Sequence, residues 1–237
     1  MSTVGLIGCQ PGGKVIEPLP GPAMIPMLQQ QQVDSPPSTT VMPTPMPTLP
    51  YGNRSLAGKT VMIDPGHGGK DSGTQGTRSP LSEKMLVLDI SNRMARELQA
   101  RGAKVYCTRD ADVFLELDQR ANAADQKKVD LFVSVHVDAI PSNPSASGTR
   151  IHIYTRPSPQ SQSAAQLMVL ALQRGGIECG GILRSNFHVI REHNRPAMLV
   201  ECGFLTNTKD TQLLNTSAYR ARLAVALADG VAAYLSK

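Results

Sequence analysis

The sequence predicts an α/β fold in which helices flank a central sheet that is mostly parallel or mixed. Three observations predict it. Short apolar runs of strand length alternate with longer segments of helical periodicity. Residues 57–237 form a stretch of suitable length for a single layered domain. The composition changes near residue 56, so this domain is preceded by a Pro-rich tail.

Residues 1–56 have the composition of a disordered tether. Eleven of the chain's 18 prolines lie within residues 1–50, together with a Gln run at 29–32 and a Ser/Thr/Pro tract at 35–48. Such a stretch buries too little apolar surface to offset its conformational entropy. We therefore expect an extended tail ahead of the folded domain.

The first nine residues contain a more specific pattern. The segment Leu6-Ile7-Gly8-Cys9 resembles the lipobox of bacterial lipoproteins, in which the cysteine is lipidated and a flexible tether follows. The segment lacks the basic region and the long apolar run of a signal peptide. Either the chain start is placed late or the match is chance, and we favour the first. Cys9 is therefore a possible lipidation site, which would attach the protein to a membrane of the cell envelope.

Charge and aromatic content argue against nucleic-acid binding. The net charge is +5, but the basic residues are dispersed among acidic ones. Tryptophan is absent and aromatic residues make up 4%, which disfavours a stacking platform for bases or sugars. Cys107, Cys179 and Cys202 lack CxxC spacing and are interpreted as unreactive buried thiols, although a disulfide between Cys179 and Cys202 is possible.

The first strand is expected at residues 61–64, where three apolar residues precede Asp64 and a Gly-rich turn. A helix should follow from Leu81-Ser82-Glu83 and end before Gly102, because apolar residues recur at helical spacing between them. The same two patterns predict further strands at residues 104–108, 130–138, 150–155, 187–190 and 197–201, helices at 115–127, 161–174 and 218–235, and a break at 175–181.

The turn after the first strand delivers His67 to the edge of the sheet where α/β proteins keep their chemistry. Glycines on both sides of His67 remove side-chain bulk, so a ligand or ion can approach the imidazole closely. A phosphate-binding loop is excluded because Asp71, not Ser or Thr, follows Lys70, and Asp64 occupies the position of the earlier glycine.

Two other strand ends carry polar residues in apolar surroundings, namely His136 and Glu201. An unpaired imidazole inside a buried strand costs about 1 kcal/mol or more, so His136 needs a partner. Glu83, in a first helical turn, is explained by the helix dipole alone, but the loop from His67 could fold it back to the same edge.

Two imidazoles and one carboxylate suffice to give a catalytic zinc ion three protein ligands and an open position, and a fourth acidic group is then free to act as a base. His188, Glu192 and His193 miss the HxxEH metalloprotease spacing by one residue and do not lie on a predicted helix. We do not expect them to be metal ligands, although His193 could line a substrate cleft.

Five blocks of residues 58–237 resemble the zinc-dependent N-acetylmuramoyl-L-alanine amidases of the amidase-3 family, which cut peptidoglycan. They are Ile63 to Gly76 (IDPGHGGKDSGTQG), Ser82 to Leu88, Thr108 to Asn122 (TRDADVFLELDQRAN), Asp130 to Ala139 (DLFVSVHVDA) and Pro196 to Asn207 (PAMLVECGFLTN). The resemblance implies that His67, Glu83 and His136 bind one zinc ion and that Glu201 is the catalytic acid/base.

The resemblance also implies the reaction: hydrolysis of the amide between the lactyl group of N-acetylmuramic acid and L-alanine of the stem peptide, in an exported protein of the periplasm or outer membrane. Asp138 matches a family position two residues past the second histidine, and could orient a ligand or form a turn. Some family members carry an inserted helix that blocks the zinc site. Residues 138–150 leave room only for a short loop, so we expect no such plug.

Two other functions share parts of this pattern. Two histidines and a carboxylate also describe the iron site of non-haem oxygenases, but those ligands commonly include a close His-x-Asp/Glu pair, which is missing here. A wall-binding lipoprotein with a degenerate amidase domain is the non-enzymatic alternative. Because all four site residues are present, an enzyme is favoured.

Overall fold

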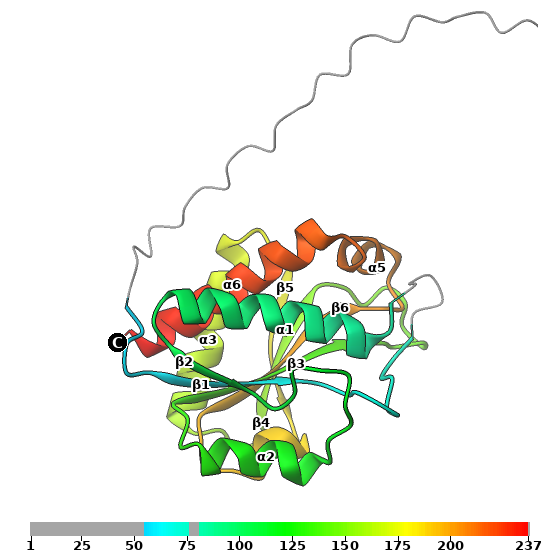
Figure 1. The fold of residues 1–237 in the computed structure, drawn as a ribbon. Helices are drawn as coiled ribbons and strands as arrows, with labels where there is room; N and C mark the ends of the chain where they lie inside the picture. Colours follow the sequence, from blue (N-terminus) through cyan, green and yellow to red (C-terminus); the bar gives the residue numbers. More distant parts are fainter. Residues whose placement is uncertain (1–54, 76–80, 237) are drawn as a thin grey trace, which may run out of the picture. The chain divides into compact units, whose positions relative to one another are not determined.

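The computed structural model describes residues 55–75 and 81–236, all of which belong to one unit of the chain spanning residues 47–237. A six-stranded sheet lies at its centre (Figure 1). The strands are β1 (Thr60–Pro65), β2 (Lys104–Cys107), β3 (Leu131–Asp138), β4 (Thr149–Tyr154), β5 (Cys179–Ser185) and β6 (Ala197–Phe204), in the order β2-β1-β3-β6-β4-β5. All neighbours are parallel except β4 and β6, so the predicted mixed, mostly parallel sheet is confirmed.

Helices cover the two faces of the sheet unequally. They are α1 (Glu83–Ala100), α2 (Leu117–Gln126), α3 (Pro159–Arg174), α4 (His188–Arg191), α5 (Thr208–Leu214) and α6 (Ser217–Leu235). The long helices α1, α3 and α6 lie on one side of the sheet, and α2 lies on the other (Figure 1). The short helix α4 packs with α2 on that second side.

The face toward α1, α3 and α6 forms the main hydrophobic core. Alternate strand residues such as Ile63, Val135 and Val200 are 0% exposed there and pack with Leu86 of α1 and Leu172 of α3. The face toward α2 and α4 has a smaller apolar cluster, which includes Phe132 and Leu199. Because successive strand residues point to opposite faces, His136 and Glu201 lie on this second face, beyond its small cluster.

The carboxyl ends of β1, β3 and β6 meet at one edge of the sheet, because these three strands are parallel neighbours. Strand β4 runs in the opposite direction, so its first residues reach the same edge. The loop between β3 and β4, residues 139–148, contains turns and no helix, as the sequence predicted.

The prediction of a strand at residues 187–190 is wrong. Phe187 precedes the one-turn helix α4, whose Val189 and Ile190 are buried against the second face of the sheet. A run of four residues with two buried side chains fits a helical turn as well as a strand, so periodicity does not separate the two.

The strand that pairs with β4 is β5, which begins at Cys179. This start lies inside residues 175–181, which were expected to be a break. Gly180 and Gly181 of β5 accompany a register shift against β4, and glycines of this kind mark bulges as often as strand ends. Helix α5 is absent from the prediction, and Leu56, placed with the tail, is fully buried in the core.

The three described cysteines are free thiols, so Cys179 and Cys202 do not form a disulfide. Burial raises the pKa of all three, which agrees with the prediction that they are unreactive. Within residues 55–75 and 81–236, no helix is long and apolar enough to cross a membrane. Cys9 and its possible lipidation lie outside the described residues.

Candidate active site

The turn that carries His67 is held by two buried arginines. Arg120 donates hydrogen bonds to the carbonyls of Pro65 (2.8 Å) and His67 (2.7 Å). Arg109 donates to the carbonyls of Gly66 (2.6 Å) and Pro65 (3.0 Å). His67 adopts a left-handed backbone conformation with φ of 57°, which is costly for a residue with a Cβ. The arginines therefore fix a strained turn at the end of β1.

Asp64 forms an ion pair with Arg120 from inside the sheet. Its side chain is 0% exposed and accepts hydrogen bonds from Arg120 (2.9 Å), Thr108 (2.5 Å) and Ser134 (2.8 Å). This network was not predicted from the sequence. An aspartate within the apolar run of the first strand is the signal that could have identified it, because a buried carboxylate requires partners.

Two glycines allow the backbone to approach the site side chains closely. A Cβ on Gly66 would lie 2.2 Å from the His136 ring. A Cβ on Gly73 would lie 2.6 Å from the Glu83 carboxylate and 2.7 Å from the His67 ring. Side chains at either position would push the site residues apart, which explains the glycines in physical terms.

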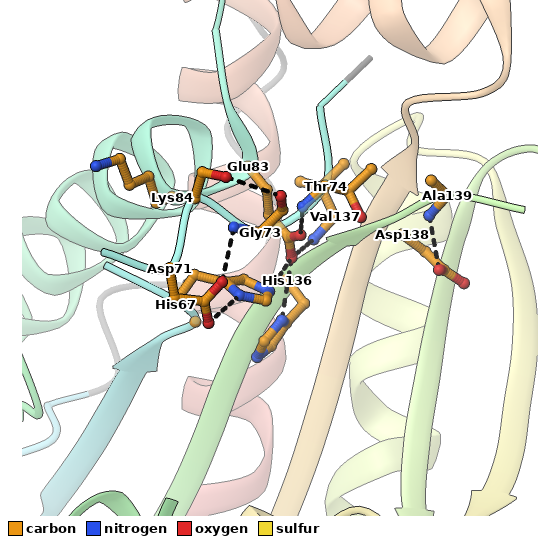
Figure 2. A network of polar contacts seen from close by, with 12 residues as sticks. His67, Asp71, Gly73, Thr74, Glu83, Lys84, His136, Val137, Asp138 and Ala139 are labelled. Carbon is orange, nitrogen blue, oxygen red and sulfur yellow. Dashed lines mark hydrogen bonds and ion pairs between the residues drawn. The ribbon is translucent and has the colours of Figure 1, made fainter. Parts of the chain in front are cut away.

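His67, Glu83 and His136 come together at the end of the sheet (Figure 2). One potential ligand atom from each lies within 4.8 Å of the other two. The Glu83 Oε1 atom is 3.1 Å from His67 Nε2 and 3.1 Å from His136 Nδ1. The two rings lie edge to face, with centroids 5.0 Å apart. Two imidazoles converging on one carboxylate form a donor set that suits a zinc ion with an open position.

Backbone donors fix Glu83 in place. The amide of Val137 donates to Oε1 at 3.0 Å and the amide of Thr74 donates to Oε2 at 2.8 Å. Burial by itself would raise the pKa of Glu83, but the hydrogen bonds with His136 and His67 outweigh it and hold the pKa well below its usual range. Glu83 is therefore an ionised carboxylate, as a metal ligand must be.

Asp71 is a site residue that the sequence analysis missed. Its Oδ2 atom is 2.8 Å from Nδ1 of His67, and its Oδ1 accepts from the amide of Gly73 at 3.0 Å (Figure 2). A carboxylate bound to the second ring nitrogen fixes the tautomer and orientation of a ligating histidine. Its position four residues after His67 in a tight turn was the available signal.

Glu201 lies beside His136 on the neighbouring strand. The two are register partners in the β3–β6 pair, so both side chains emerge on the same face. Glu201 is 8% exposed, and its Oε2 atom has no hydrogen-bond partner among the residues that the structure describes. Burial, together with the charges of Glu83 and Asp138, raises the pKa of Glu201 well above its usual value. A buried acid with a free oxygen is suited to proton transfer.

A cleft of about 380 Å³ joins these groups, and it is lined by His67, Asp71, Glu83, His136, Asp138 and Glu201. A second hollow of about 350 Å³ adjoins it on the other side of the two histidines. This hollow has an apolar wall that includes Phe114, Leu117 and Phe187. The site thus has an acidic side and an apolar side.

The remaining candidate residues do not join the group of His67, Glu83 and His136, although His188 lines the second hollow. His188 pairs with Asp118 across α4 and α2 at 2.6 Å, Glu192 pairs with Arg191, and His193 packs against the Phe132 ring with centroids 4.9 Å apart. None of the three belongs to the metal-type cluster. Asp138 lines the cleft, and its Oδ1 accepts from the amide of Ala139 at 2.7 Å (Figure 2). Its role in orienting a ligand stays a prediction.

Known proteins are similar to this chain in sequence and in fold. LytC of Bacillus subtilis (strain 168), an N-acetylmuramoyl-L-alanine amidase, is 34% identical over 180 residues, which are 76% of this chain but only 36% of LytC. The catalytic domain of the amidase CwlV from Bacillus (Paenibacillus) polymyxa var. colistinus matches with a TM-score of 0.70 and 35% identity, over 75% of this chain and 98% of that domain.

An N-acetylmuramoyl-L-alanine amidase from Clostridium difficile 630 has a TM-score of 0.71 and 34% identity, over 76% of this chain and 98% of that one. A family model described as N-acetylmuramoyl-L-alanine amidase matches residues 61–233, which include every residue of the cleft. The chain belongs to the N-acetylmuramoyl-L-alanine amidase family.

Proposed function

We propose that this chain is a zinc-dependent hydrolase that cuts the amide between the lactyl group of N-acetylmuramic acid and L-alanine of the peptidoglycan stem peptide. The observation that carries the proposal is the convergence of His67, Glu83 and His136, with Glu201 lining the same cleft. Family membership supports the substrate class. The chain spans 36% of the length of LytC, so we propose, and do not take as given, that it shares the activity of that whole protein.

His67, Glu83 and His136 would hold the zinc ion, with Asp71 keeping the His67 ring in its orientation. The set fits zinc, because imidazole nitrogens and a carboxylate oxygen are common zinc ligands in catalytic sites. When bound in such a site, zinc lowers the pKa of a water molecule toward neutrality and polarises a carbonyl group.

Glu201 would move the protons of the reaction. It takes a proton from the attacking water and returns it to the nitrogen of the departing stem peptide, which would otherwise leave as a very unstable anion. Burial raises the pKa of Glu201 and so favours the protonated form, which can donate to the departing nitrogen. In this role, Glu201 has the nitrogen of the scissile amide within its reach.

A non-catalytic wall-binding protein is the alternative, and an oxygenase that uses iron at the same three ligands is another. Hydrolysis is favoured over both alternatives, because a buried carboxyl group with an unpaired oxygen, Glu201, is not needed for binding alone. Attachment of the chain to the cell envelope through a lipid on Cys9 remains a prediction to be tested separately.

The test is mass spectrometry of purified peptidoglycan after digestion by the full chain. Cleavage at the lactyl amide releases stem peptides that begin with a free L-alanine amine and leaves intact glycan. We expect a chelator to abolish this release and added zinc to restore it. Binding of peptidoglycan without any released peptide would favour the binding protein, and cleavage of another bond would contradict the proposed reaction.

Metal analysis of the purified protein tests the ligand set. His67→Ala and His136→Ala are each expected to lose the metal and the activity together, because two remaining ligands bind zinc poorly. Stoichiometric zinc in either variant would show that the ligand set is wrong. Iron in place of zinc in the unaltered chain would support the oxygenase instead.

A further inference from the structure

Arg150 lies in line with the site residues across three strands. It is the register partner of Glu201 in the antiparallel pair β4–β6, and Glu201 is in turn the partner of His136 in β3–β6. Partners in adjacent strands point to the same face of a sheet. His136, Glu201 and Arg150 therefore form a row at the sheet edge, with Glu201 in the middle.

The Arg150 guanidinium is held in a fixed place beyond Glu201. Its carbon lies 5.7 Å from the centroid of the Phe204 ring, and its Nη1 donates to the carbonyl of Thr149 at 3.1 Å. Gly180 of β5 provides the space, because a Cβ there would lie 1.9 Å from Nη1. This glycine accompanies the register shift between β4 and β5, so the irregularity of the edge strand accommodates the arginine.

Arg150 forms no ion pair with any of the described residues, in contrast to Arg120, which is neutralised by Asp64. Its Nε and Nη2 donors also have no hydrogen-bond partner within residues 55–75 and 81–236. The nearby Glu178 is occupied by Lys209 at 2.7 Å and by Ser147 at 3.1 Å. A half-buried guanidinium with two free donors presents the planar fork that binds a carboxylate in a bidentate manner.

The acidic lining of the cleft indicates what kind of ligand the Arg150 guanidinium could bind. The cleft is lined by four acidic residues, Asp71, Glu83, Asp138 and Glu201, and, among the residues that the structure describes, by no lysine or arginine, so a carboxylate on the substrate would need a cation from outside this lining. Under the proposed function, Glu201 gives its proton to the peptide nitrogen, so this nitrogen lies beside Glu201, which stands between His136 and Arg150 in the row.

We propose that Arg150 binds a free carboxylate on the peptide portion of the substrate and thereby selects acidic stem peptides. The proposal rests on the proposed amidase function, and it adds a specificity-determining residue that neither holds the metal nor moves a proton. The ligand class is an acidic peptide whose carboxylate follows shortly after the first alanine.

The test compares two muramoyl-L-alanyl peptides, one with a free carboxylate on the second residue and one with that carboxylate amidated. Arg150→Met is expected to lower kcat/KM for the free carboxylate about 10- to 100-fold, mainly through KM, and to change that for the amide by less than about twofold. Arg150→Lys, which keeps the charge but loses the fork, should fall between. Arg184→Met, on exposed β5, is the matched control and should behave as the unaltered chain.

Equal losses on both substrates would overturn the proposal, because they would show that Arg150 acts through Glu201 or the fold. Calorimetric binding of both peptides to Glu201→Gln separates this inference from the proposed function. If the unaltered chain cleaves neither peptide, the hydrolase assignment fails, while a binding preference for the carboxylate that Arg150→Met removes still supports the subsite. Equal binding of the two peptides, or binding of neither, overturns it.

Discussion

The two faces of the central sheet are made by the same strands, yet they have different tasks. On the face toward α1, α3 and α6, apolar side chains such as Val135 and Val200 are fully buried under long helices. On the other face, against which only α2 and α4 pack, the next residues along the same strands are His136 and Glu201, beyond the small apolar cluster. Because successive side chains of a strand point to opposite faces, the core residues and the site residues lie on opposite sides of the sheet.

This difference divides the energetic roles as well. Apolar burial stabilises the first face in proportion to the area removed from water. The second face contains buried charges, which cost desolvation free energy unless they are paired. We therefore expect substitutions on the first face to change stability with little effect on the site, and substitutions at Glu201 to do the reverse.

Glu201→Gln should have the largest effect on activity. The amide has the same size as the carboxyl group but neither accepts nor returns a proton, so turnover should fall by about 10²- to 10⁴-fold. Zinc content should stay unchanged, and the melting temperature should stay equal or rise, because a buried carboxyl with a free oxygen is removed. Released-peptide assays, metal analysis and calorimetry check the three expectations. Retained turnover would remove Glu201 from the role of acid/base.

The polar residues of this face were predictable from sequence to the extent that they interrupt apolar strands. His136 and Glu201 stand at the ends of runs of Val, Leu and Phe, so their need for partners was evident. Glu83 and its partnership with both histidines came from the family resemblance, because a glutamate in a first helical turn has an ordinary explanation. Asp71 and the arginines of the His67 turn depend on loop backbone geometry, which periodicity does not contain.

The fold shows the same limit. The strands of the core were found because each is a continuous apolar run, as buried parallel strands are. Strand β5 was not predicted, because Gly180 and Gly181 resemble a break between elements. Helix α4 was predicted as a strand, because a single helical turn is too short to show the 3.6-residue period of a helix. Edge elements of this kind are decided by tertiary contacts and not by local sequence.

Arg120→Met tests whether the second face depends on its buried ion pair. The change leaves Asp64 charged and without its cation inside the sheet, which should cost about 3–5 kcal/mol of unfolding free energy. It also frees the carbonyls of Pro65 and His67, so zinc affinity per folded molecule should fall. Denaturant titration and zinc competition measure the two effects. Arg195→Met, which breaks the half-exposed pair with Asp125, is the control and should cost about 1 kcal/mol or less.

Leu172→Ala is the corresponding change on the first face. Leu172 of α3 is 0% exposed in the main core, and truncating it should lower the unfolding free energy by about 2–5 kcal/mol through lost burial and a new cavity. Zinc affinity and kcat of the folded fraction should remain as in the unaltered chain. A loss of zinc affinity similar to that of Arg120→Met would show that the two faces are not independent.

Asp89→Asn should have the smallest effect, and it contrasts a half-buried carboxylate–arginine pair with the fully buried one. Asp89 of α1 binds Arg220 of α6 at 2.5 Å and Arg93 at 2.9 Å, and its side chain is 32% exposed. Burial by itself would raise the pKa of Asp89, but the hydrogen bonds from Arg220 and Arg93 outweigh it and lower the pKa. A lowered pKa in the folded state means that the pairing stabilises the fold above the usual aspartate pKa. This stabilisation is lost as the pH falls through the folded-state value.

The Asp89→Asn variant should therefore lower the unfolding free energy by about 1 kcal/mol or less at pH 7, and this cost should shrink as the pH falls below about 4. Parallel urea titrations of both proteins across that pH range measure it. A cost that persists in acid would mean that Asp89 acts through packing between α1 and α6 and not through its charge.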